Sequence, residues 1–130
     1  MQGRENEGAG KSKMKRKVIG LVESIYIRID SENGGSREVK VKAKIDTGAS
    51  MSSISKRLVS RLKLQLHHRT AMVKSALGRE RRTMLKLPIR MHGKHLKAFF
   101  SVADRKNLAH KMLIGQNILK LGKFVIDPLK

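Results

Sequence analysis

The sequence contains no cysteine and no tryptophan, and aromatic residues make up only 3% of its 130 residues. Without cysteine, disulfide scaffolds, thiolate zinc sites and cysteine nucleophiles are excluded. The longest apolar run, residues 18–22, has five positions even when Gly20 is counted, so neither a transmembrane helix nor a signal-peptide core is recognisable. These absences predict a soluble, cytoplasmic protein with no membrane partner.

Acidic residues are also scarce: 10 Asp and Glu stand against 30 Lys and Arg, which gives a formal net charge of +20. A field of this sign attracts anions, so nucleic acid, acidic membranes and acidic polypeptides are the candidate partners. The shortage of aromatic rings disfavours a stacking platform for single strands, and no amphipathic helix suits a membrane surface. Residues 1–17 are predicted to be a disordered basic tail, and residues 18–130 suffice for one domain.

Short segments typical of strands, separated by turn residues, fill the rest of the chain. The expected elements are strands over 18–30, 37–45 and 124–128, hairpins over 72–87 and 85–100, turns at 33–35 and 92–94, and a helix over 55–62 capped by Ser53 or Ser55. In the strand at 37–45, apolar residues alternate with mostly charged ones, which indicates one buried face and one wet face. The pattern predicts a mainly β domain with one or two short helices.

Of the four aspartates, Asp46 alone stands where an apolar strand runs into a glycine turn. The segment from Asp46 to Ser50 reads Asp-Thr-Gly-Ala-Ser, and an apolar-apolar-glycine element follows later at Leu113, Ile114 and Gly115. Together, in this order and spacing, the two motifs resemble those of the retropepsin-like aspartic proteases. Over residues 18–129, the chain is similar more narrowly to a prokaryotic single-domain group that is labelled ATP-dependent zinc proteases and found with ATP-grasp amino-acid ligases.

The resemblance implies a closed β-barrel of the acid protease type and an aspartic endopeptidase that works as a homodimer. One Asp46 from each subunit would supply the two carboxylates that activate a water molecule for attack on a peptide bond. The supporting residues of this loop would be Thr47, Gly48, Ala49 and Ser50. Thr47 would join the two loops across the two-fold axis, and the Ala49 amide or Ser50 would bond the carboxylate.

A β-hairpin flap would cover this site, because such a hairpin stands at the corresponding place in the family. By order along the chain, its residues would be Val73, Lys74, Ser75, Ala76, Leu77, Gly78 and Arg79. The loop that packs behind the catalytic turn would consist of Leu113, Ile114 and Gly115. The flap region is basic, with Lys74, Arg79, Arg81 and Arg82 against Glu80. This excess of positive charge favours acidic peptides as substrates.

No metal or other cofactor is expected, despite the zinc label of the similar group. The histidine pairs at 67–68 and 92–95 do not have the spacing of a zinc site, and no His-Glu-x-x-His helix exists. Residues 10–12 read Gly-Lys-Ser, but the first glycine of a phosphate-binding loop is replaced by Glu5. ATP dependence therefore finds no support in the residues.

The alternative function is a non-catalytic module of the same retropepsin-like fold that binds RNA or ribosomal particles through its basic surface. Under that hypothesis Asp46 is only a turn residue at the end of a strand, and residues 79–82 are a solvated hairpin tip. Under both hypotheses Asp127 is expected to be a turn residue and not a second catalytic acid.

Overall fold

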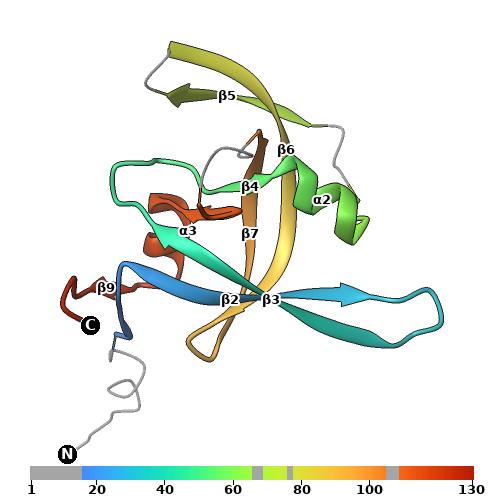
Figure 1. Cartoon of the computed structure of the whole chain (residues 1–130), viewed down its shortest axis with the longest axis horizontal. Helices are drawn as coiled ribbons and strands as arrows, with labels where there is room; N and C mark the ends of the chain where they lie inside the picture. Colours follow the sequence, from blue (N-terminus) through green and yellow to red (C-terminus); the bar gives the residue numbers. More distant parts are fainter. Residues whose placement is uncertain (1–15, 66–68, 76–77, 105–108) are drawn as a thin grey trace, which may run out of the picture.

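The computed structural model describes residues 16–65, 69–75, 78–104 and 109–130, so most of the predicted tail at 1–17 lies outside the described residues. The strands are β1 (Val18–Ile19), β2 (Val22–Asp30), β3 (Ser36–Ile45), β4 (Ser53–Ser55), β5 (Thr70–Ser75), β6 (Gly78–Met91), β7 (Lys94–Ala103), β8 (Met112–Ile114) and β9 (Val125–Ile126), and the helices are α2 (Lys56–Leu62) and α3 (Gln116–Leu121). Figure 1 shows their arrangement. The prediction of a mainly β fold with short helices is confirmed.

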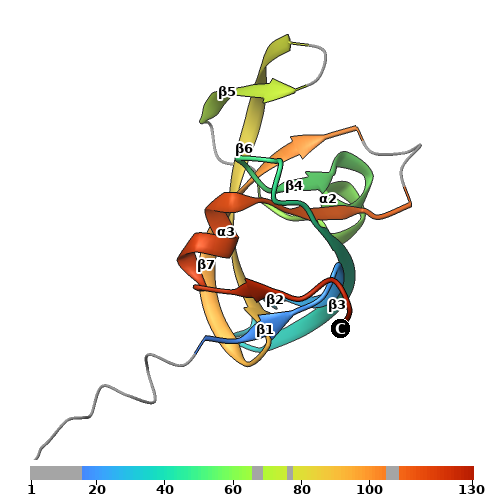
Figure 2. The same cartoon turned by 90° about the vertical axis from the view of Figure 1, so that its left-hand side faces the viewer.

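Six strands close into a barrel. They pair in the order β2, β3, β8, β4, β7 and β6, and β6 returns to β2 through the pairs Tyr26 with Arg90 and Ile27 with Ile89. Figure 2 shows this closed course of the strands around the core. Closure leaves no open edge between β2 and β6 and gives every strand one face toward the core.

Alternation along the strands decides which side chains enter the core. In β3, Val41, Ala43 and Ile45 are buried, whereas the lysines between them are exposed. The buried apolar side chains of the barrel include Ile25, Ile27, Leu85, Leu87, Ile89, Phe100, Met112 and Ile114. The predicted wet and buried faces of this strand are therefore confirmed.

The predicted hairpins are present, and β6 belongs to two of them. It pairs with β5 at one end and with β7 at the other, so one strand of 14 residues runs from the flap into the barrel. The β6–β7 turn places His92 at φ 50° and Gly93 at φ 78°, the two positive values that a tight hairpin turn requires. Helix α2 begins after Ser55, whose hydroxyl accepts a hydrogen bond from the Leu58 amide at 3.3 Å. Of the two predicted caps, Ser55 is the one used.

The predicted strand at 18–30 is interrupted, because β1 leaves the barrel and pairs in parallel with β9. At the break, the Gly20 amide donates to the Glu23 carboxylate at 2.6 Å instead of to a neighbouring strand. The strand predicted at 124–128 is correspondingly short. Asp127 is a turn residue, as expected: its carboxylate accepts a hydrogen bond from the Leu129 amide at 2.9 Å.

Glu23 connects three parts of the fold at one end of the barrel. Its carboxylate accepts the Gly20 amide and lies 2.7 Å from His92 Nε2 in the β6–β7 turn, and its side chain is 15% exposed. Burial alone would raise the pKa of the Glu23 carboxyl. The hydrogen bonds from Gly20 and His92 and the charges of His92 and Lys130 outweigh burial, so the pKa lies below its ordinary value. The ionised carboxylate therefore stabilises this end of the fold.

None of the helices in the described ranges is long and apolar enough to cross a membrane.

Replacing Glu23 by Gln is expected to lower the free energy of unfolding near neutral pH by about 2 kcal/mol, because a charged hydrogen-bond acceptor is lost. Since the pKa of Glu23 is lowered in the folded state, its contribution is complete above the ordinary glutamate range and disappears as the pH falls through the lowered pKa. The free energies of unfolding of wild type and Glu23→Gln, measured in urea, should therefore converge as the pH falls from about 6 to about 3. Glu32→Gln, in the exposed β2–β3 turn, is the control. A stability difference that stays constant over this range would contradict the assignment.

Candidate active site

Asp46 follows the last residue of β3, at the point where β3 runs beside β8. The Asp46 amide donates to the Ile114 carbonyl at 2.9 Å, and this bond continues the parallel pairing of Ile45 with Ile114. The carboxylate is half-buried and accepts a hydrogen bond from the Gly48 amide at 2.9 Å. The Ala49 amide donates to the main-chain carbonyl of Asp46 at 3.2 Å. The carboxylate is therefore bonded by the Gly48 amide, and not by the Ala49 amide or Ser50 as expected.

The loop after Asp46 is tight and partly exposed. A Cβ at Gly48 would lie 3.3 Å from Asp46 Oδ1, which leaves little room for a side chain beside the carboxylate. Thr47 is exposed, and its carbonyl accepts a hydrogen bond from Gln116 Nε2 at 2.8 Å. The predicted bridge through the Thr47 hydroxyl needs a second copy of the chain and stays a prediction.

The β8–α3 segment, which contains Leu113, Ile114 and Gly115, is hydrogen-bonded to this loop. The Gln116 amide donates to the Ala49 carbonyl at 2.8 Å, and the Asn117 amide donates to the Ser50 carbonyl at 3.2 Å. A Cβ at Gly115 would lie 2.7 Å from the Ala49 carbonyl oxygen, a distance that real Cβ atoms do not adopt. Only glycine therefore allows the two segments to approach so closely.

A buried polar network joins the same two segments, and sequence reasoning missed it. Asn117 Oδ1 accepts hydrogen bonds from the Ser52 amide at 2.8 Å and the Ser52 hydroxyl at 2.7 Å, and Asn117 Nδ2 donates to the Phe99 carbonyl at 2.9 Å. The Ser52 hydroxyl also accepts the Gly115 amide at 2.8 Å. A polar Asn117 within the apolar stretch from Met112 to Leu119 was the signal for such a role.

Asp46 lines a pocket of about 260 Å³, to which residues of the flap also contribute. The lining residues are Asp46, Gly48, Ala49, Ser50, Met51, Ser53, Val73, Lys74, Arg82 and Leu113. The pocket thus brings together the predicted catalytic loop, part of the predicted flap and Leu113. Six other described residues were predicted as site residues but do not line it: Thr47, Ser75, Gly78, Arg79, Ile114 and Gly115. Met51 and Ser53 were not among the predicted site residues, and Arg82 was predicted only as part of the basic flap region.

The flap is the hairpin of β5 and β6, which projects beyond the barrel at the top of Figure 1. Ser75 pairs with Gly78 at its end, while the predicted flap residues Ala76 and Leu77 lie outside the described residues. Alternation along β6 places Arg82 toward the pocket and its neighbour Arg81 on the opposite side of the strand. Arg82 donates to the Glu80 carboxylate at 2.8 Å, and Arg81 donates to Thr70 Oγ1 at 3.2 Å.

Within the described ranges, no group of three or more His, Asp or Glu side chains is arranged to hold a metal ion. His67 and His68 lie outside the described residues. The chemical group that the pocket offers is thus the Asp46 carboxylate, with Lys74 and Arg82 as the cations beside it.

A family model described as "gag-polyprotein putative aspartyl protease" matches residues 34–121, a span that includes the Asp46 loop, the flap and the β8–α3 segment. The chain belongs to this aspartyl protease family. A search among curated proteins found no match.

Solved structures share the fold of this aspartyl protease family member at low sequence identity. A Legionella pneumophila protein of unknown function has a TM-score of 0.61 at 16% identity, with 89% of this chain and 96% of that chain covered. EIAV protease in complex with an inhibitor has a TM-score of 0.57 at 20% identity, with 78% and 86% covered. The retroviral protease-like domain of Ddi1 from Leishmania major has a TM-score of 0.50 at 20% identity, with 81% and 76% covered. The predicted retropepsin-like barrel is therefore confirmed.

Replacing Asn117 by Ala is expected to lower the free energy of unfolding by about 3 kcal/mol, because the amide and hydroxyl of Ser52 and the Phe99 carbonyl lose their half-buried hydrogen bonds. The control is Asn33→Ala in the exposed β2–β3 turn, for which a change within about 0.5 kcal/mol is expected. Chemical denaturation of both variants measures the difference. Equal stabilities would show that the network does not hold the loop.

Proposed function

We propose that the protein is an aspartic endopeptidase that acts as a homodimer. The Asp46 carboxylates of its two subunits together activate a water molecule that hydrolyses the peptide bond. The observation that carries this proposal is the pocket that Asp46, anchored by the Gly48 amide, lines together with the flap residues Val73 and Arg82. Family membership and the retropepsin-like barrel support the same function.

The number of carboxylates supports the shared site. Among the described residues that line the pocket, Asp46 is the only one with a carboxyl group. Peptide hydrolysis without a metal needs a base for the water and an acid for the carbonyl oxygen and the leaving nitrogen. One carboxylate does not serve both roles at once, so the second comes from another copy of the chain. Two-fold symmetry places two identical residues opposite each other at the axis.

In the dimer, the two carboxylates share one proton, because two negative charges at such short range are unfavourable. The ionised Asp46 takes a proton from water as the water oxygen attacks the peptide carbonyl carbon, and the protonated Asp46 of the second subunit gives its proton to the carbonyl oxygen. When the tetrahedral intermediate collapses, the Asp46 that gave up its proton takes one back from a hydroxyl group of the intermediate as the C=O bond re-forms, the C–N bond breaks, and the nitrogen leaves with the proton that the other Asp46 took from water. The bond from Gly48 keeps the carboxylate in place, and Thr47 would join the two loops.

We place the enzyme in the prokaryotic single-domain group that its motifs resemble, and in the cytoplasm. The likeness of the fold to that of a bacterial protein supports this placement.

The substrate that we infer is an acidic polypeptide. Lys74 and Arg82 line the same pocket as Asp46, and Arg82 is held toward it beside Glu80. A carboxylate on the substrate near the cleaved bond gains attraction from both cations, whereas a basic side chain there is repelled.

Asp46→Asn is expected to reduce kcat/KM for peptide cleavage by at least about a thousandfold, because the general base is lost. The thermal stability of the variant should match that of wild type, since the amide of Asn retains an acceptor for Gly48. Asp30→Asn, on the exposed end of β2, is the matched control and should cleave normally. Cleavage by Asp46→Asn at the wild-type rate would refute the assignment of Asp46.

Mixing wild type with Asp46→Asn tests whether two subunits share one active site. If wild type and Asp46→Asn exchange subunits freely, activity should follow the square of the wild-type fraction, because only dimers with two Asp46 residues are active. Activity proportional to the wild-type fraction would mean that each chain carries a complete site. Size-exclusion chromatography with light scattering at each mixing ratio verifies the dimer.

Arg82→Gln is expected to lower kcat/KM for a peptide with glutamate beside the cleaved bond by about three- to tenfold, and to leave a glutamine analogue unaffected. The preference of wild type for the acidic peptide should also weaken as salt is raised. Arg81→Gln, one residue away on the other face of β6, should leave kcat/KM unchanged for both peptides. Equal effects of the two variants would contradict the acidic preference while leaving the Asp46 chemistry standing.

A further inference from the structure

A second chemically distinct surface lies on the outside of the barrel, on strands β3, β2, β6 and β7. The strand register places Lys40 beside Tyr26, Tyr26 beside Arg90, and Arg90 beside His95, in one row across the four strands. The next rows add Glu38 beside Arg28, Lys97 beside Pro88, and Phe99 beside Lys86. The outer basic face is defined here as Tyr26, Arg28, Glu38, Lys40, Lys42, Lys86, Arg90, His95, Lys97 and Phe99.

The charge of the outer basic face is strongly positive, and its one carboxylate is already engaged. Glu38 accepts hydrogen bonds from Arg90 Nη2 at 2.8 Å and from Arg90 Nε at 3.0 Å. These bonds hold the pKa of the Glu38 carboxyl below its ordinary value, so it remains ionised and paired. Lys40 and Lys97 are exposed, and Arg28 is exposed beside Asp30, to which it donates at 3.1 Å. Lys40 and Lys97 are therefore available to an anionic partner, and Arg28 would bind one by exchanging its exposed bond to Asp30.

Two of the few aromatic rings of the chain lie on this face, together with cations. The Arg90 guanidinium carbon lies 4.2 Å from the centre of the Tyr26 ring, and Lys86 Nζ lies 5.3 Å from the centre of the Phe99 ring. Both rings are half-buried, and 33% of the Arg90 side chain is exposed. Aromatic rings and guanidinium planes on an open sheet are the surfaces on which unpaired bases stack. The shortage of aromatic residues argued against this use, but the fold concentrates Tyr26 and Phe99 on one face.

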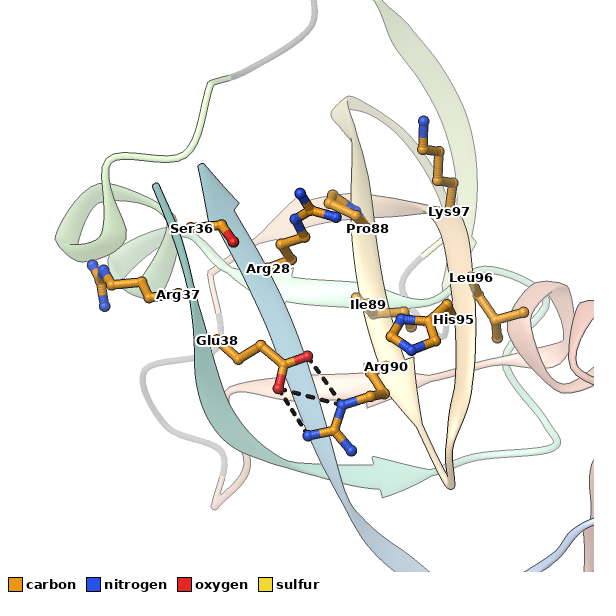
Figure 3. Close-up of a pocket in the computed structure, with 10 residues that line it drawn as sticks. All are labelled: Arg28, Ser36, Arg37, Glu38, Pro88, Ile89, Arg90, His95, Leu96 and Lys97. Atoms are coloured by element: carbon orange, nitrogen blue, oxygen red, sulfur yellow. Dashed lines mark hydrogen bonds and ion pairs between the residues drawn. The ribbon is translucent and has the colours of Figure 1, made fainter. Parts of the chain in front are cut away.

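The face is hollowed as well as charged. Figure 3 shows the hollow, of about 640 Å³, with Arg28 on β2, Glu38 on β3, Arg90 on β6 and Lys97 on β7 around it. The strand β3 connects it to the candidate active site, but Glu38 and Asp46 are separated by about 26 Å along that strand at roughly 3.3 Å per residue. A ligand in the hollow therefore does not occupy the Asp46 pocket.

We propose that the outer basic face binds single-stranded nucleic acid, with phosphates on Arg28, Lys40 and Lys97 and bases against Phe99 and the stacked pair of Arg90 and Tyr26. Positive charge alone suits any polyanion, but cations interleaved with aromatic rings suit a chain that alternates phosphates with flat bases. This binding is independent of the proposed peptide hydrolysis, because it uses none of the residues of the Asp46 pocket.

The charge contribution is tested with the full chain and a fluorescent 20-mer of uridine RNA, by anisotropy titration at several salt concentrations. The triple variant Arg28→Gln, Lys40→Gln, Lys97→Gln should bind at least about tenfold more weakly and reduce the slope of log K against log salt by about 2, since each phosphate contact on a single strand contributes about 0.7. The matched control is Lys56→Gln, Arg57→Gln, Lys120→Gln on the exposed faces of α2 and α3, which removes the same charge. Equal losses in the two triple variants would overturn the assignment of this face.

The stacking contribution is tested with Tyr26→Leu and Phe99→Leu combined, which keep apolar bulk but remove the rings. Affinity for the RNA should fall at least about fivefold with the salt slope unchanged, whereas Phe124→Leu, whose ring lies near Lys94 off this face, should bind normally. Melting temperatures of the variants verify their folding. The same titrations with a thymidine 20-mer distinguish RNA from DNA, and binding of either supports the proposal.

Polyglutamate of matched charge, added as a competitor, tests the other kind of polyanion. Weak competition supports a nucleic-acid surface. If polyglutamate displaces the RNA at equal charge concentration and the double leucine variant binds RNA like wild type, the face is a site for acidic polypeptide and the proposal is overturned. Asp46→Asn should bind the RNA like wild type, and a loss of binding in that variant would show that the RNA enters the candidate active site instead.

Discussion

The hydrogen bonds between the Asp46 loop and the β8–α3 segment are the constraint on which the rest of the site depends. Main-chain bonds from Asp46, Gln116 and Asn117 join two segments that are far apart in sequence, and Gly115 lets them come close enough to form these bonds. A loop that carries the reacting group on its own would sample many conformations. Here the loop is positioned by backbone groups of the barrel together with the side chains of Ser52 and Asn117.

Much of the fold followed from local patterns. Alternation in β3 predicted its buried face, and the glycine turns at 33–35 and 92–94 predicted two hairpins, because these signals depend on neighbouring residues alone. The break at Gly20 was missed. It depends on β9, the side chain of Glu23 and the β6–β7 turn, which only the folded chain brings together. The closing pair of β2 with β6 was equally beyond local reasoning, although the family resemblance implied the barrel.

The candidate site shows the same division between local and long-range information. Asp46 and Gly115 were predicted because their motifs are contiguous in sequence. The acceptor role of Asn117 and the position of Arg82 in the pocket depend on partners many residues away. The basic composition predicted an anionic partner but not where that partner binds. The strand register separates the charge into a flap beside Asp46 and an outer face at the opposite end of β3, which composition does not distinguish.

The length of β6 has a mechanical consequence. The strand runs without interruption from Gly78 to Met91, and the nine residues from Arg79 to Leu87 include neither glycine nor proline. A rigid lid rotates about a hinge, and hinges need residues that absorb a large change in backbone angles. On the β6 side, which the structure describes throughout, the flap leaves the barrel with no loop or strand end that could act as such a point. It would therefore open by bending of the paired β5–β6 strands, with small changes in backbone angles distributed along their length. Because β6 continues into the barrel, the barrel strands would oppose this bending.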